Sequence, residues 1–222
     1  MALKKAKRKP VSVNPKILLL YGAPKVGKTT MLSQLNDCLV IDTESGSHML
    51  EGYFHSVNSK EDLLSFYKDA SDGHDYQIFA LDTIDKLVEW TGKDVCKEMG
   101  VDDIADLPYG KGFGMVRERV MNNIKKLQSL CPKTIIIGHR KTATAIDNST
   151  AVEPESLDLS GKLKNQLMAQ SDAIGYMFRD EEDKLMVSFQ SGLALEAGSR
   201  CEHLKGKVFP FDWKKIYIKE SK

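Results

Sequence analysis

The segment GAPKVGKT at residues 22–29 decides the fold class of this chain. It follows a short apolar run, KILLLY at residues 16–21, and it leads into residues 29–35, which we expect to form a helix. Glycines at both ends of such a loop allow the main chain to fold tightly, so that its N–H groups face an anionic oxygen. The segment therefore predicts a phosphate-binding loop that holds a nucleoside triphosphate.

The residue types in this loop predict separate contacts to the nucleotide. We expect Lys28 to contact the β and γ phosphates and the Thr29 hydroxyl to bind Mg²⁺. Asp82 follows the apolar run YQIFAL at residues 76–81, where a carboxylate can support the same ion, although a turn or capping role is the alternative. ATP and Mg²⁺ are the expected cofactors. The predicted nucleotide-binding residues are Gly22, Ala23, Pro24, Lys25, Val26, Gly27, Lys28, Thr29 and Thr30.

Short apolar runs alternate with segments of helical spacing along the chain. The predicted strands are residues 16–21, 38–41, 76–81 and 134–137, and the predicted helices are 29–35, 59–70, 84–100 and 115–130. Residues 173–178 and 185–189, joined by the charged segment 179–183, predict an antiparallel hairpin. The order predicts an α/β fold with a mostly parallel central sheet flanked by helices and a C-terminal hairpin.

Composition limits the number of domains and the global charge. A chain of 222 residues with 41% hydrophobic residues can bury one substantial core, which we place at residues 15–222. The net charge of +1 gives no global reason for a nucleic-acid partner. Residues 1–14 are rich in Lys and Arg and predict a flexible basic tail, which either contacts phosphates or only solubilises the end of the chain.

The pattern of apolar residues and cysteines indicates the compartment. No segment approaches the roughly 18 apolar residues that span a bilayer, so we expect no membrane partner and a cytoplasmic location. Cys38, Cys96, Cys131 and Cys201 are scattered without a Cys-x-x-Cys pair. We therefore expect reduced thiols, not a zinc site or a disulfide framework.

Hydrolysis requires a group that activates water, and two positions compete for that role. In one arrangement a Glu directly follows the metal-supporting Asp, but here Thr83 follows Asp82. Glu44 lies just beyond the strand that follows the phosphate-loop helix. Glu44 is therefore the better candidate for the general base.

With Glu44 in that place the chain resembles the RecA-like ATPases, and among them the short phage-encoded proteins of single-strand annealing and recombination. The resemblance covers residues 16–206 and is carried by residues 22–30, 81–83, 109–114, 137–139 and 158–163. It implies a RecA-like P-loop NTPase fold with Glu44 and Lys28 as catalytic residues. It also implies that His139 senses the γ-phosphate, with a purely structural histidine as the alternative.

The same resemblance implies single-stranded DNA as a partner, a homo-oligomer in the form of a ring or filament, and a single-strand-binding protein as a further candidate partner. The polar stretch 140–160 lies where RecA-like proteins hold DNA, and it is too long for a simple connector. Arg140 and Lys141 are candidate DNA contacts there, with Lys111 in a second segment. A solvated loop and a helix entry are the respective alternatives.

RecA-like subunits place a basic residue on the nucleotide of a neighbour. Arg200, Lys205 and Lys207 lie in the corresponding part of this chain, although surface solvation explains each equally well. No N-terminal domain or apolar linking segment precedes Lys16, so the way in which subunits join stays open. Two other functions also stay open, a small-molecule or nucleotide kinase and a nucleotide-dependent adaptor or DNA-packaging component without hydrolysis.

Overall fold

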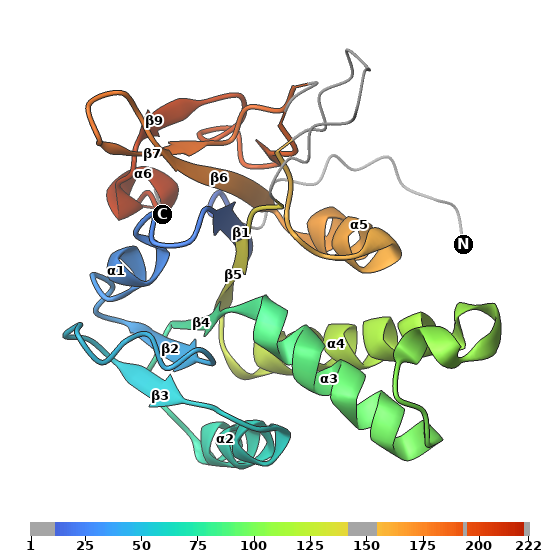
Figure 1. The fold of residues 1–222 in the computed structure, drawn as a ribbon. Coiled ribbons are helices and arrows are strands. Elements are labelled where there is room, and N and C mark those ends of the chain that lie inside the picture. The colour runs from blue at the N-terminus through green and yellow to red at the C-terminus, as the bar shows by residue number, and fades with distance from the viewer. Residues whose placement is uncertain (1–11, 142–154, 193–194, 220–222) are drawn as a thin grey trace, which may run out of the picture.

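The computed structural model describes residues 12–141, 155–192 and 195–219. Its core is an α/β sheet with strand order β3-β2-β4-β5-β1-β6-β7-β9, and β8 pairs with β6 (Figure 1). The strands are β1 (Ile17–Gly22), β2 (Cys38–Asp42), β3 (Phe54–Ser56), β4 (Ile78–Asp82), β5 (Lys133–His139), β6 (Ala173–Arg179), β7 (Leu185–Ser188), β8 (Gly198–Ser199) and β9 (Val208–Pro210). The strands from β3 to β6 are parallel, as predicted.

Helices cover both faces of this sheet (Figure 1). They are α1 (Lys28–Leu32), α2 (Lys60–Asp72), α3 (Ile84–Met99), α4 (Lys111–Leu130), α5 (Gly161–Gln170) and α6 (Trp213–Ile216), with 3₁₀ turns η1 (Ile104–Asp106) and η2 (Pro108–Gly110). Side chains of α2, α3, α4 and α5 share one apolar cluster with Leu19 and Tyr21 of β1. Side chains of α1 and α6 share the other cluster with Leu18 and Leu20. Strand β1 is buried on both faces because its apolar residues face a helical layer in either direction.

The register of the sheet gathers polar residues at the carboxyl ends of its parallel strands. We call this side of the sheet the nucleotide edge. Asp42 pairs with Asp82 at the ends of β2 and β4, and Gly22 pairs with His139 at the ends of β1 and β5. Parallel strands end on the same side, and a ligand binds where the chain leaves neighbouring strands in opposite directions. That switch lies between β1 and β5, because β1 leads to β2 at one side of the sheet and β5 leads to β6 at the other.

Most predicted elements are confirmed. The four predicted parallel strands and the hairpin are present, and the Ser59 hydroxyl accepts from the Asp62 N–H at the start of α2, 3.1 Å away. Gly100 ends α3 in the left-handed conformation. Helix α1 ends at Leu32, earlier than predicted, and α4 begins at Lys111, earlier than predicted. The two unpredicted elements that matter most are β3, which has 3 residues, and α5, which follows the polar stretch 140–160.

The two ends of the described chain meet near the amino end of β1, away from the nucleotide edge. The Asn14 amide donates to the Ile218 carbonyl at 2.8 Å and accepts from its N–H at 2.9 Å. Most of the predicted basic tail, residues 1–11, lies outside the described residues. Among the described helices, none combines the length and apolarity that crossing a bilayer requires.

Candidate nucleotide site

The loop at residues 22–29 wraps tightly around its own lysine. Gly27 has φ of 118° at the start of α1, a value that glycine adopts without strain. A side chain on Gly22 would lie 2.4 Å from the Met177 carbonyl oxygen, so β6 presses directly against the loop. Lys28 is only 6% exposed, and its Nζ donates to the carbonyls of Gly22 and Ala23 at 3.1 and 2.9 Å.

The charge on Lys28 is placed for an anion. Burial lowers the pKa of Lys28, and the nearby carboxylates of Asp82 and Glu44 oppose that shift. A buried cation held by neutral carbonyls gains much from a phosphate, because the interaction is stronger where water is excluded.

Thr29 and Asp82 bring two oxygen donors together beside Lys28. The Thr29 hydroxyl donates to Asp82 Oδ2 at 2.7 Å. Burial, and then the negative charges of Glu44 and Asp42, raise the pKa of Asp82 to about 6, against a hydrogen bond from Thr29 that lowers it. This donor set fits Mg²⁺, which prefers oxygen ligands and keeps several waters. Among the described residues there is no cluster of three or more His, Cys, Asp or Glu side chains that could hold a metal.

Asp42 organises the segment that carries Glu44. Its carboxylate accepts from the main-chain N–H groups of Glu44 and Ser47, both at 3.0 Å, and from the Ser47 hydroxyl at 2.5 Å. Burial raises the pKa of Asp42, but the hydrogen bonds from Ser47, Glu44 and Gly46 outweigh it and hold the pKa below its usual value. Asp42 is therefore a structural anion that fixes the turn after β2.

Glu44 is exposed, and the neighbouring strand holds its side chain. The Thr83 hydroxyl donates to Glu44 Oε1 at 3.0 Å. Thr83 is itself fixed by Thr43, whose hydroxyl accepts from the Thr83 N–H at 2.8 Å and donates to the Thr83 carbonyl at 3.1 Å. These bonds tie the ends of β2 and β4 together, so they fix the position of Glu44 relative to Asp82.

His139 lies at the end of β5, opposite Gly22. Asp85, in the first turn of α3, lies 3.3 Å from His139 Nδ1 and accepts from its main-chain N–H at 3.3 Å. The hydrogen bond with Asp85 raises the pKa of His139, and burial opposes it. His139 therefore connects the edge beside the phosphate loop to α3.

The predicted DNA contacts occupy two places. Arg140 Nη1 donates to Glu155 at 2.9 Å and to the Tyr176 hydroxyl at 3.1 Å, and it lines a hollow shared with residues 23–26 of the loop. Lys141 is exposed, and its N–H donates to the Ser156 carbonyl. Lys111 is exposed at the start of α4. Residues 142–154 of the predicted DNA loop lie outside the described residues.

The predicted trans-acting residues lie at the other edge of the sheet. Arg200 follows β8, which pairs with the start of β6, and it contacts the Ala169 carbonyl and Asp172, 3.7 Å away. Lys205 is exposed in the turn that follows, where its N–H bonds to the Cys201 carbonyl. Neither residue lies at the nucleotide edge of its own chain.

The roles of Thr43, Thr83, Asp42 and Asp85 were missed by the sequence prediction. The sequence carries a signal for three of them, because the pair Asp-Thr ends both β2 and β4. Two parallel strands that end in the same pair place the two threonines side by side once their register is known.

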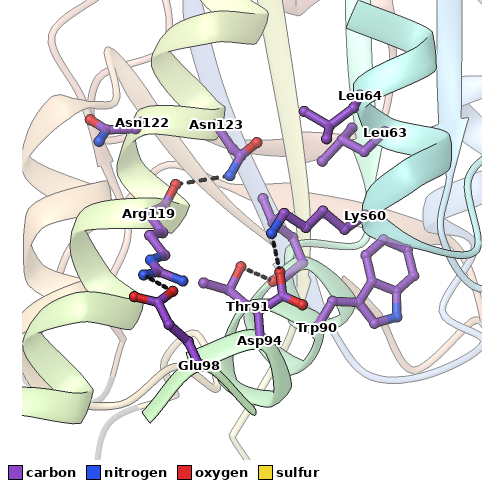
Figure 2. A pocket seen from close by; sticks show the side chains of 11 residues that line it. Lys60, Leu63, Leu64, Trp90, Thr91, Asp94, Glu98, Arg119, Asn122 and Asn123 are labelled. Atoms are coloured by element: carbon purple, nitrogen blue, oxygen red, sulfur yellow. Dashed lines mark hydrogen bonds and ion pairs between the residues drawn. The ribbon is translucent and has the colours of Figure 1, made fainter. Parts of the chain in front are cut away.

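A separate hollow of about 400 Å³ lies between α2, α3 and α4 (Figure 2). Lys60 pairs with Asp94 at 2.7 Å and Arg119 with Glu98 at 2.6 Å, so its charged groups satisfy one another. None of its lining residues belongs to the phosphate loop.

Comparisons with known proteins found a family match and a relative. A family model described as "AAA domain" matches residues 14–201. The chain is 24% identical over 190 residues to the SPbeta prophage-derived uncharacterized protein YorG of Bacillus subtilis (strain 168). That match covers 81% of this chain and 56% of YorG, so the chain spans little more than half the length of this relative.

Proposed function

The chain belongs to the AAA domain family, and from that premise we propose that it is a Mg²⁺-dependent ATPase that binds single-stranded DNA and assists annealing in phage-type recombination. The observation that carries the ATPase half is one set of contacts. Buried Lys28 lies in the loop, Thr29 lies 2.7 Å from Asp82, and Glu44 is held by Thr83 at the same edge. Each of these groups has a place in phosphoryl transfer to water.

The roles of the side chains follow from their chemistry. Lys28 would bind the terminal phosphates, and Thr29 and Asp82 would hold Mg²⁺. The ion neutralises charge on the β and γ phosphates when it is bound. Glu44 takes the proton of the attacking water, because it is a carboxylate in the turn after β2, beside Asp82, and is oriented by Thr83.

The DNA half rests on charge, on connectivity and on the prophage relative. Arg140 and Lys141 follow His139 directly, so a strand bound there would sense the nucleotide edge. Lys111 adds a second basic position. YorG is described as prophage-derived, which fits a phage setting. We further propose assembly into a ring or filament, with Arg200 or Lys205 reaching the neighbouring nucleotide, because both lie away from their own site.

Two variants test the nucleotide site in the purified protein. Lys28→Ala removes the one buried positive charge in the loop, so we expect loss of micromolar ATP affinity, measured with a fluorescent ATP analogue. Glu44→Gln should keep nucleotide binding but abolish most phosphate release. Lys68→Ala, an exposed lysine on α2, is the matched control and should behave as wild type. Unchanged turnover in Glu44→Gln overturns the assignment of the base.

The same assay separates the rival functions. Phosphate release without any acceptor, and faster release when single-stranded DNA is added, supports the proposal. Strict dependence on a small-molecule acceptor identifies a kinase instead. Tight nucleotide binding without turnover identifies an adaptor or packaging component.

A further inference from the structure

A hollow of about 460 Å³ opens between α3, α4 and the start of α5, outside the nucleotide site. Two exposed aromatic side chains line this hollow. Tyr109 is 106% exposed and lies in the left-handed conformation at φ 56°, and Phe113, one helical turn further on, is 45% exposed. We call this hollow the aromatic groove. Exposed aromatic rings grouped at one hollow are typical of a binding surface.

The charges around the aromatic groove have one sign. Arg117 and Lys162 line it, and Lys111 lies between the two aromatic residues in sequence. In the part of the chain that the structure describes, no ion pair engages these three cations, and no acidic residue lines the groove. Unpaired cations beside exposed rings match a polyanion whose charges alternate with flat, stackable groups.

Two acidic residues just before Tyr109 in the chain accept hydrogen bonds from the backbone. Asp103 accepts from the Ala105 N–H at 2.8 Å, and Asp106 accepts from the Asp103 N–H at 3.2 Å, which together form a capping box on η1. Their carboxylates therefore cap η1 and do not line the groove.

The groove is rigidly built. A side chain on Gly112 would lie 2.3 Å from the Ile104 carbonyl oxygen, so α4 packs directly on η1 and fixes the turn that carries Tyr109. The opposite wall begins at Ser160 and Gly161, at the N-terminus of α5, whose partial positive charge favours a phosphate. A preformed surface binds with a smaller loss of conformational entropy.

We infer that the aromatic groove stacks the bases of single-stranded nucleic acid on Tyr109 and Phe113 while Lys111, Arg117 and Lys162 neutralise its phosphates. This inference rests on the proposed function and extends it, because Arg140 and Lys141 explain only contact with the backbone. The groove supplies the aromatic surface that base stacking requires.

Stacking is tested with two labelled strands of equal length and charge, oligo-dT and an abasic oligomer, in fluorescence anisotropy with a non-hydrolysable Mg-ATP analogue. Wild type should prefer oligo-dT by roughly tenfold or more. The double variant Tyr109→Ala with Phe113→Ala should lose this preference, and Tyr109→Phe with Phe113→Tyr should keep it. Tyr53→Ala, at a 52% exposed tyrosine before β3, is the matched aromatic control and should keep the preference.

The salt dependence of affinity tests the cations separately. Lys111→Gln, Arg117→Gln and Lys162→Gln should each reduce the slope of log affinity against log salt by about 0.7. Lys125→Gln, at an exposed site further along α4, should leave the slope unchanged. The aromatic variants should lower affinity equally at every salt concentration.

Failure of the inference differs from failure of the proposed function. Wild type that binds both strands equally, or a double variant that still prefers oligo-dT, overturns the groove as a stacking site. Tyr109→Ala alone is decisive if the double variant does not fold, because a fully exposed ring contributes little to the core. Binding of the fluorescent ATP analogue is measured on the same preparations, and only its absence in wild type removes the nucleotide site itself.

Discussion

The Thr83 hydroxyl orients the Glu44 carboxylate by donating a hydrogen bond to it. Among the hydrogen bonds of the described residues, removing this hydroxyl breaks that bond alone. The Thr43 hydroxyl bonds to the main-chain N–H and carbonyl of Thr83, so Thr83→Val keeps those two bonds and loses the bond to Glu44. One such hydrogen bond contributes about 1–1.5 kcal/mol. If it orients the base in the transition state, its loss lowers kcat about tenfold.

The prediction for Thr83 is a change in kcat without a change in KM for ATP, measured by steady-state phosphate release. Thr83→Ser restores the hydroxyl and should recover most of kcat. A rise in KM with unchanged kcat would instead place Thr83 in nucleotide binding, and equal loss in the Val and Ser variants would indicate a structural role.

At the scale of the secondary-structure elements, two glycines in the first turns of α4 make a matched pair. Gly112 faces Ile104 so closely that a methyl group would lie 2.3 Å from a carbonyl oxygen, while the nearest atom to a methyl group on Gly114 is Arg117 Nη2 at 3.9 Å. Alanine favours a helix over glycine by up to about 1 kcal/mol. Overpacking against a fixed backbone costs about 1–3 kcal/mol.

We therefore expect the two alanine variants to change stability in opposite directions. Gly114→Ala should raise the free energy of unfolding in urea, and Gly112→Ala should lower it. The first variant controls for helix propensity in the second. Equal shifts of one sign in both variants would mean that the contact between α4 and η1 does not constrain the helix.

The elements that sequence could predict are those with strong local signals. Apolar runs next to a glycine or an aspartate marked β1, β2 and β4, and Ser59 marked the start of α2. Strand β3 was missed because three residues at the edge of a sheet carry no period. Helix α5 was missed because only Leu163 and Leu167 of its residues are buried, which leaves a weak apolar stripe.

The residues of the candidate site could likewise be predicted only where the sequence signal is local. Lys28, Thr29 and Asp82 lie in a local motif and at a strand end, and the structure brings them together. The contact between Thr83 and Glu44 depends on the register of β2 against β4, in which Asp42 meets Asp82. The aromatic groove depends on three elements that are distant in sequence. Neither could be predicted without the pairing of strands and the packing of helices.

In the whole molecule, the nucleotide edge and the aromatic groove share a connection through His139. Asp85 holds His139 from the first turn of α3, and α3 forms one wall of the groove. The His139 carbonyl also accepts from the Asp158 N–H at 2.9 Å, just before the segment that begins the opposite wall. A shift of His139 toward a γ-phosphate would therefore move both walls.

Such a connection predicts reciprocal coupling between the two ligands. If the Mg-ATP analogue tightens binding of oligo-dT by some factor, oligo-dT must tighten binding of the analogue by the same factor, typically between about 5 and 150. Asp85→Ala removes the contact with His139 and should reduce both factors together, while each ligand alone still binds. The two affinities are measured by titrating either ligand in the presence and absence of the other. An unchanged factor in Asp85→Ala would exclude α3 as the element through which the nucleotide reaches the groove, and the Asp158 contact would then be the remaining route.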